Sequence, residues 1–148
     1  MMKLVPALCR FRSIVTLTLT LSVLVPVAVA AAADFPFEQQ LMLDVAPMGK
    51  VRRVPSVMIS VDGTARLELW CKTASAQVAI DATAIQILPA PLPDALPQYM
   101  SDGQCSPERM AADTDLLAAL SQVTTWQSAG GVITLGGPSV LRFRPSDH

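Results

Sequence analysis

Few side chains in this sequence are of the types that carry out chemistry, and they form no catalytic pattern. The only histidine is His148, the last residue, where chains usually fray. Nucleophilic catalysis needs an imidazole or another base beside the nucleophile, so no catalytic residue is assigned and we expect no enzyme. Zinc sites need clusters of His and Cys, and Asp113-Thr114-Asp115 lacks the other ligands of a calcium loop. We therefore expect no metal and no cofactor, with Asp113 and Asp115 solvated at the start of a helix.

Cysteine is the other residue type that could react, and the sequence contains three: Cys9, Cys71 and Cys105. Cys9 lies in an N-terminal export signal, described below, and is lost when that signal is removed. In an oxidising compartment the remaining two predict a disulfide between Cys71 and Cys105. Closing the loop between Cys71 and Cys105 with a disulfide stabilises a fold by about 3–4 kcal/mol. The alternative is a reactive thiol, which would need a neighbouring base or metal.

Three places could contribute to a binding surface. Arg142 and Arg144 are two positions apart on a predicted strand, so they share a face and could hold an anion. The alternative is that both are simply solvated on the outer face of that strand. Trp70 falls on a predicted outer face, where it could anchor a partner, or it could pack beneath a loop or helix. Tyr99 could form part of an apolar rim near Cys105.

The first 33 residues have the organisation of a secretory signal. Basic residues precede an uncharged run, which ends in small residues that allow cleavage after Ala30 or Ala33. An uncleaved membrane anchor is the alternative, although the apolar run is only about the minimum length that spans a bilayer. We expect a periplasmic or secreted bacterial protein with one mature domain over residues 34–148 and no stable membrane anchor.

The charge balance argues against a nucleic-acid partner. The signal removes three of the eleven basic residues and none of the twelve acidic ones, which leaves a net charge of about −4. The remaining basic residues are scattered, and only Arg52 and Arg53 are adjacent. Nucleic acids require a concentrated positive surface, so we expect none to bind.

Alternating apolar and polar residues predict a series of strands. The alternation begins at Phe35 and continues to Val45. It resumes on both sides of Asp62-Gly63, which predicts a hairpin of Val57–Val61 and Ala65–Cys71 with positive φ at both turn residues. The remaining predicted strands are short: Ala76–Ile80, Ala84–Leu88, Val123–Gln127, Val132–Leu135 and Val140–Arg144.

One helix is predicted between the two groups of strands. Four prolines make Pro89–Gln98 a loop. Ser106-Pro107-Glu108 then combines an N-cap serine, a proline in the first helical position and an acid in the first turn. We expect a helix from there to about Ser121. The fold class is α+β, a mostly antiparallel sheet that can curl into a barrel, with one helix before a C-terminal β-meander.

The C-terminal third resembles a known family. The residues that carry the resemblance are Cys105-Ser106-Pro107-Glu108, Leu116–Val123, Trp126, Val132–Leu135 and Leu141–Pro145. Over residues 105–145 the chain resembles the META-domain (HslJ-like) family of bacterial envelope proteins. The hairpin at Val57–Gly63 is similar too, but Trp70-Cys71-Lys72 stands where the family has glycine, cysteine and asparagine. The resemblance implies a divergent, small, exported β-rich domain linked to heat shock, antibiotic tolerance and envelope stress, with no catalytic residues to carry over.

Three hypotheses for function follow. The leading one is a non-enzymatic exported domain that serves envelope maintenance or stress tolerance through binding or a structural role, with an envelope protein as its partner. The alternative is an inhibitor of a secreted hydrolase, lysozyme or a protease, in which the loop Pro89–Gln104 fills the cleft of the target. The third, a hydrolytic enzyme, would require the fold to bring two acidic residues together.

Overall fold

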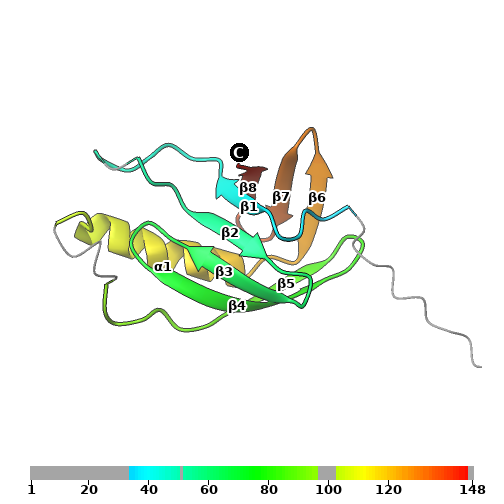
Figure 1. Ribbon diagram of the computed structural model, residues 1–148, viewed down its shortest axis with the longest axis horizontal. Helices are drawn as coiled ribbons and strands as arrows, with labels where there is room; N and C mark the ends of the chain where they lie inside the picture. The colour runs from blue at the N-terminus through cyan, green and yellow to red at the C-terminus, as the bar shows by residue number, and fades with distance from the viewer. Residues whose placement is uncertain (1–33, 51, 97–102, 147–148) are drawn as a thin grey trace, which may run out of the picture.

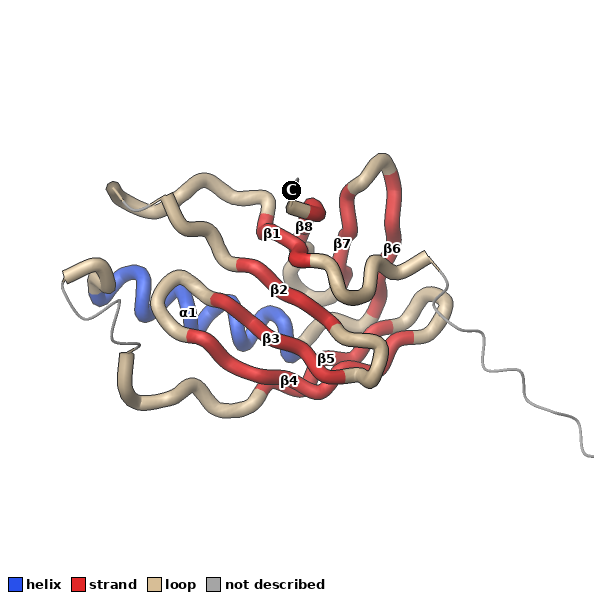
Figure 2. Tube along the Cα trace, in the orientation of Figure 1, coloured by secondary structure: helices blue, strands red, loops and turns tan. Residues whose placement is uncertain are grey.

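The computed structural model describes residues 34–146, apart from residue 51 and residues 97–102. Eight strands form a single antiparallel sheet that curls into a nearly closed barrel, with one helix (Figure 1, Figure 2). This confirms the predicted α+β class. The elements are β1 (Gln40–Leu43), β2 (Ser56–Ile59), β3 (Thr64–Glu68), β4 (Thr73–Ile80), β5 (Ile85–Pro89), α1 (Pro107–Ser121), β6 (Thr125–Ala129), β7 (Val132–Gly136) and β8 (Leu141–Pro145).

The strand order places β5 and β6 at the two edges of the sheet. It runs β5-β4-β3-β2-β1-β8-β7-β6, so two meanders are joined by the pairing of β1 with β8. Helix α1 connects the two edge strands, β5 and β6, and contacts β5. Among the described residues, one isolated bridge between Ala84 and Thr125 joins these edges, supported by the Trp126 N–H donating to the Thr83 carbonyl at 2.9 Å. The barrel is therefore closed at one end of this seam.

The core fills the inside of the curled sheet, as alternation along each strand requires. Its side chains come from all eight strands and from the C-terminal half of α1. Burying each large aliphatic or aromatic side chain contributes about 1.5–3 kcal/mol. Trp126 is part of this core, where its ring meets Phe35 edge-on at a centroid distance of 5.1 Å. Its indole N–H donates to the Asp81 carbonyl at 2.8 Å, so the one polar atom of the ring is satisfied.

The β2–β3 hairpin forms where Asp62-Gly63 predicts it, but with a different turn. Only Gly63 has a positive φ, of 82°, so the expected positive φ at Asp62 is wrong. The Gly63 N–H donates to the Ser60 carbonyl at 3.0 Å, and the Ser60 N–H donates to the Thr64 carbonyl. This is a three-residue loop with glycine in the left-handed position. A Cβ at Gly63 would lie 2.9 Å from the Val78 carbonyl oxygen, which explains why glycine is required there.

The first strand is shorter than its alternation predicts. β1 covers only Gln40–Leu43, whereas the pattern extends from Phe35 to Val45. The chain leaves the extended conformation at Glu38, which has a φ of 58°. Phe35 is nevertheless buried in the core. Alternation alone therefore predicted which side chains are buried better than it predicted the backbone conformation.

The helix begins where its capping residues predict. The Ser106 hydroxyl accepts a hydrogen bond from the Arg109 N–H at 3.3 Å, and Pro107 is the first helical residue. The buried side of α1 consists of Arg109, Asp113, Leu116 and Leu120. The expectation that Asp113 is solvated is therefore wrong, since its exposed fraction is 0%. Two of these four buried residues are charged, because they bind the turn between β3 and β4.

Candidate functional site

Trp70 is buried, with 6% of its surface exposed, so its assignment to an exposed binding surface is wrong. β3 ends at Glu68, and the strand alternation that placed Trp70 outside does not extend to it. Trp70 instead lies in a tight turn closed by the Leu69 N–H donating to the Lys72 carbonyl at 2.8 Å. The alternative interpretation, that this tryptophan packs inside, is the one that the structure supports.

Two buried charged side chains of α1 hold this turn. The Asp113 carboxylate accepts hydrogen bonds from the backbone N–H groups of Cys71, at 3.1 Å, and Lys72, at 2.9 Å. The Arg109 guanidinium donates to the Trp70 carbonyl at 2.8 Å and, on its other side, to the Gln104 carbonyl at 2.5 Å. The two side chains are one helical turn apart, so both reach the same turn. We call Arg109, Asp113 and the turn Leu69–Lys72 the buried clamp.

The environment of Asp113 changes its proton affinity. Burial raises the pKa of the Asp113 carboxyl above its ordinary value. The backbone N–H groups of Lys72, Cys71 and Trp70 and the positive charge of Arg109 act in the opposite direction and offset part of this effect. A charge buried this deeply is tolerated only when hydrogen bonds replace its lost water. The clamp therefore fixes the turn against the helix rather than offering a reactive carboxylate.

The predicted disulfide joins the same two segments as the buried clamp. Cys71 and Cys105 are paired, with their Cα atoms 5.7 Å apart. Cys71 lies in the turn that Asp113 holds, and Cys105 directly precedes the N-cap Ser106. A covalent bond and a polar network thus fasten the β3–β4 turn to the start of α1. A disulfide is typical of proteins that mature in an oxidising compartment.

The other predicted surface residues have different outcomes. Arg142 and Arg144 are both exposed on β8, as their shared parity predicts. Arg144 forms an ion pair with Asp44 at 3.1 Å, so part of its charge is already compensated. Tyr99 lies outside the described residues. The structure does not bring these residues together with Trp70 into one surface.

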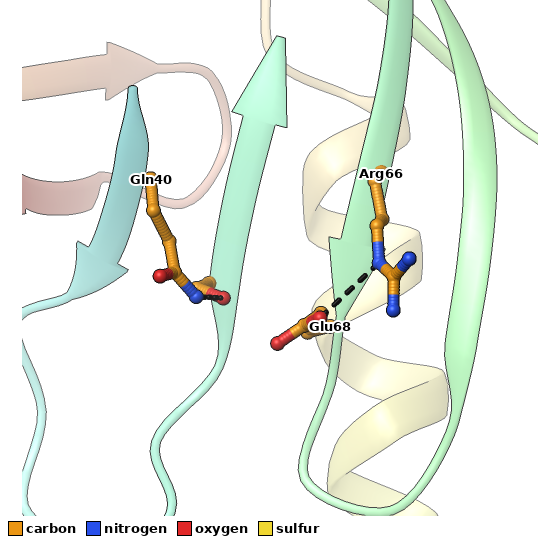
Figure 3. Close-up of polar contacts among 4 residues, drawn as sticks. Gln40, Arg66 and Glu68 are labelled. Atoms are coloured by element: carbon orange, nitrogen blue, oxygen red, sulfur yellow. Dashed lines mark hydrogen bonds and ion pairs between the residues drawn. The ribbon is translucent and has the colours of Figure 1, made fainter. Parts of the chain in front are cut away.

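An open groove lies elsewhere, on the outer face of the barrel. It has a volume of about 560 Å³ and crosses the first three strands. Figure 3 shows three of its lining residues, Gln40 of β1 and Arg66 and Glu68 of β3. The residues that line it are Glu38, Gln39, Gln40, Ser56, Met58, Arg66, Glu68 and Ser146. We call this set the outer groove.

The floor of the outer groove is polar and held in place. The Gln40 amide donates to the Ser56 hydroxyl at 2.9 Å (Figure 3). Ser56 is only 3% exposed although it lies on the outer face of the sheet, which shows that the floor has depth. The bond uses the amide nitrogen of Gln40 and an oxygen lone pair of Ser56. The Gln40 carbonyl oxygen can accept a further hydrogen bond and the Ser56 hydroxyl can donate one.

Arg66 and Glu68 form the charged wall of the groove. Arg66 Nε and Glu68 Oε1 are 3.1 Å apart, and 62% of the Arg66 side chain is exposed (Figure 3). The pair uses only Nε of the guanidinium. Both terminal nitrogens of Arg66 have no protein partner among the described residues. The ion pair therefore orients the guanidinium, and its terminal nitrogens point away from Gln40 in Figure 3.

Glu38 closes one end of the groove in an unusual backbone conformation. Its φ of 58° is in the left-handed region, which costs a residue with a Cβ about 1–2 kcal/mol. The Glu38 carboxylate accepts hydrogen bonds from the Val61 N–H at 3.1 Å and the Ser60 hydroxyl at 3.4 Å. These bonds attach the segment before β1 to the β2–β3 turn. Strain of this kind often accompanies binding sites.

The outer groove offers hydrogen bonds and charge, and none of its lining residues is a histidine or a cysteine. Within the described part of the chain, no group of three or more His, Cys, Asp or Glu side chains could hold a metal ion. None of the described helices is long and apolar enough to cross a membrane. Comparison with models of known families, with curated proteins and with solved structures finds no match to this chain. The META-domain resemblance therefore stays a prediction.

Sequence reasoning missed both the buried clamp and the outer groove. A signal for the clamp was present, because Arg109 and Asp113 continue the helical spacing of Leu116 and Leu120. The groove left a weaker signal. Gln40, Met58 and Arg66 each occupy polar-side positions of their strands, but only the strand register places them in one row.

Proposed function

We propose that this protein is a non-enzymatic binding domain of the bacterial cell envelope, and that its ligand binds in the outer groove. The observation that carries the proposal is a polar depression with a hydrogen-bonded floor and an oriented, exposed guanidinium. Such convergence of a few polar groups in a concave site is typical of ligand sites. The barrel interior is filled by the core, so the outer face is the surface that supports binding best.

The export signal and the disulfide support placement in the periplasm or outside the cell. The sequence of residues 1–33 supports export, and the Cys71–Cys105 bond fits an oxidising compartment. The resemblance of residues 105–145 to the META-domain family supports a role in envelope maintenance or stress tolerance. In this proposal the partner is an envelope component, and the chain carries out no chemistry on it.

A genetic test follows from the groove. Met58 lies in the groove with 36% of its surface exposed, and Leu88 is 57% exposed on β5, outside the groove. In a strain that lacks the protein, the wild-type chain and Leu88→Glu are expected to restore survival under detergent or antibiotic stress, whereas Met58→Glu fails. The melting temperatures of the three purified proteins serve as the folding control. Full rescue by a folded Met58→Glu protein would rule out the groove as the functional surface.

A hydrolase inhibitor is the second candidate, and one observation favours it. The described ends of the loop are anchored to the fold: the Ala90 N–H donates to the Ser75 carbonyl at 2.8 Å, and Lys72 Nζ donates to the Pro93 carbonyl at 2.7 Å. Cys105 holds the other end through the disulfide. Anchored loops lose little freedom on binding a cleft. Inhibition of lysozyme or a protease at stoichiometric concentration, unaffected by Met58→Glu, would support this candidate over the first.

A further inference from the structure

The disulfide and the buried clamp meet at one junction, between the β3–β4 turn and the start of α1. We propose that the clamp assembles before the disulfide and positions Cys71 and Cys105 for oxidation, with Cys105 as the sulfur that reacts first with the oxidant. The oxidant is a disulfide-bearing molecule or protein of the compartment in which the chain folds. Arg109 is then a positioning residue for this step, and the outer groove takes no part in it.

Arg109 holds the backbone immediately before each cysteine. One terminal nitrogen of its guanidinium donates to the carbonyl of Trp70, which precedes Cys71, at 2.8 Å. The other donates to the carbonyl of Gln104, which precedes Cys105, at 2.5 Å. Nε of Arg109 is buried without a hydrogen-bond partner among the described residues, an arrangement that costs free energy. Both terminal nitrogens are therefore committed to the two cysteine-bearing segments, although this leaves the third nitrogen unsatisfied.

Asp113 completes this positioning from the next turn of the helix. Its carboxylate accepts hydrogen bonds from the N–H of Cys71 itself, at 3.1 Å, and from the N–H of Lys72, at 2.9 Å. Cys71 and Cys105 are 34 positions apart in the sequence, so in an unfolded chain their thiols meet only at an entropic cost. Once the clamp has formed, the two segments are already adjacent, and closing the disulfide no longer carries that cost.

Accessibility sets the order in which the two cysteines react. Cys71 is fully buried, whereas Cys105 is half-buried and lies between the exposed residues Gln104 and Ser106. Thiol–disulfide exchange requires access to the sulfur, so in the folded, reduced protein the oxidant reaches Cys105 first.

The oxidation then takes two exchange steps. The Cys105 thiolate attacks the disulfide of the oxidant, whose S–S bond breaks, and one oxidant thiol leaves as a mixed disulfide forms. Cys71 loses its proton and attacks the Cys105 sulfur, which forms the Cys71–Cys105 bond and releases the second oxidant thiol. The two cysteines together lose two electrons and two protons, and the oxidant is reduced to two thiols.

Single-cysteine variants test the order of reaction without changing the clamp. Cys71→Ser leaves the Cys105 thiol and Cys105→Ser leaves the Cys71 thiol, and every protein also carries Cys9→Ser so that only these two thiols are followed. Each folded variant is treated with oxidised glutathione, and the mixed disulfide is measured over time by mass spectrometry. Cys105 is expected to react faster than Cys71 by about tenfold or more, because a buried thiol reacts only after local opening. Equal rates, or a faster Cys71, would overturn the assigned order.

The redox equilibrium tests the positioning role of Arg109. The protein is equilibrated with glutathione buffers, and the disulfide-bonded fraction gives the equilibrium constant for closing the bond. Arg109→Met removes both bridging hydrogen bonds and is expected to lower this constant by about tenfold or more. Arg109→Lys keeps the charge without the two-pronged guanidinium and is expected to recover only part of the loss.

Two control variants separate positioning from general stability. Arg142→Met removes an exposed arginine of β8, and Ile133→Val weakens the core in β7. Both are expected to keep the wild-type equilibrium constant. An unchanged constant in Arg109→Met, or an equal loss in Ile133→Val, would overturn the role of Arg109. Reduced wild-type protein should also keep its near-ultraviolet circular dichroism, and its loss would show that the clamp does not assemble before the bond.

Discussion

The buried clamp and the outer groove each contain an arginine and an acid, and burial decides what each pair can do. In the buried clamp, Arg109 and Asp113 use their hydrogen bonds on backbone groups, those of one turn and the Gln104 carbonyl. In the outer groove, Arg66 and Glu68 bind each other and leave the outer edge of the guanidinium in solvent. The same residue types stabilise the fold in one place and are available for recognition in the other.

Removing the buried carboxylate should have the largest effect. Asp113→Ala leaves the Cys71 and Lys72 N–H groups without their acceptor and removes a negative charge that interacts with Arg109. Breaking such a buried network costs about 3–5 kcal/mol of unfolding free energy, measurable by urea denaturation. Asp115→Ala, at an exposed position of the same helix, is the matched control. A loss below about 1 kcal/mol in Asp113→Ala would show that the clamp is not a stabilising element.

Removing the disulfide should have a somewhat smaller effect. Cys71→Ser combined with Cys105→Ser is expected to lower the unfolding free energy by about 2–4 kcal/mol. The buried clamp still holds the turn to the helix, so the variant should fold and keep its near-ultraviolet circular dichroism. Complete unfolding at room temperature would mean that the clamp cannot hold this turn without the covalent bond.

The pH dependence of stability should reveal the buried carboxyl. The pKa of Asp113 is raised in the folded protein, so the folded protein binds this proton more tightly than the unfolded chain does. Its contribution to stability is therefore complete in acid, below the ordinary pKa of 3.8, and is lost as the pH rises through the raised folded-state pKa. Relative to Asp113→Asn, which does not titrate, wild-type protein should lose unfolding free energy across that interval. A relative gain with rising pH would contradict the assigned direction.

The smallest effect on stability is expected in the outer groove. Arg66→Ala and Glu68→Gln should change the unfolding free energy by no more than about 0.5 kcal/mol, because exposed ion pairs contribute little. Ligand binding should nevertheless fall in Arg66→Ala. Thermal unfolding of the purified variants and photo-crosslinking from position 58 test these two statements. A large destabilisation would mean that Arg66 belongs to the scaffold, as Arg109 does.

The fold was largely predictable from local signals. The serine-proline start of α1 and the alternation of β2 and β3 each act over a few residues, and the structure contains both. The hairpin at Asp62-Gly63 also forms, but with a different turn. Errors arose where a distant contact overrides the local pattern. Glu38 leaves the extended conformation and its carboxylate binds the hairpin turn at Ser60 and Val61.

The sites were less predictable because both depend on register and long-range packing. The alternation of β3, continued to residue 70, predicted that Trp70 is exposed. The chain instead turns there, and Arg109, 39 positions away, donates a hydrogen bond to the Trp70 carbonyl. The outer groove needs Gln40, Met58 and Arg66 in one row, and only the pairing of three strands places them there. Arg142 and Arg144 were placed correctly on one face of a strand because that prediction required only alternation.

Photo-crosslinking in living cells tests the central claim, that the outer groove is the binding surface, most directly. Benzoylphenylalanine is introduced at Met58 in the groove or at Leu88 outside it, both on the outer face of the barrel. We expect irradiation to give a defined crosslinked envelope product from position 58, reduced by Arg66→Ala, and none from position 88. A product from position 88 with none from position 58 would contradict the account.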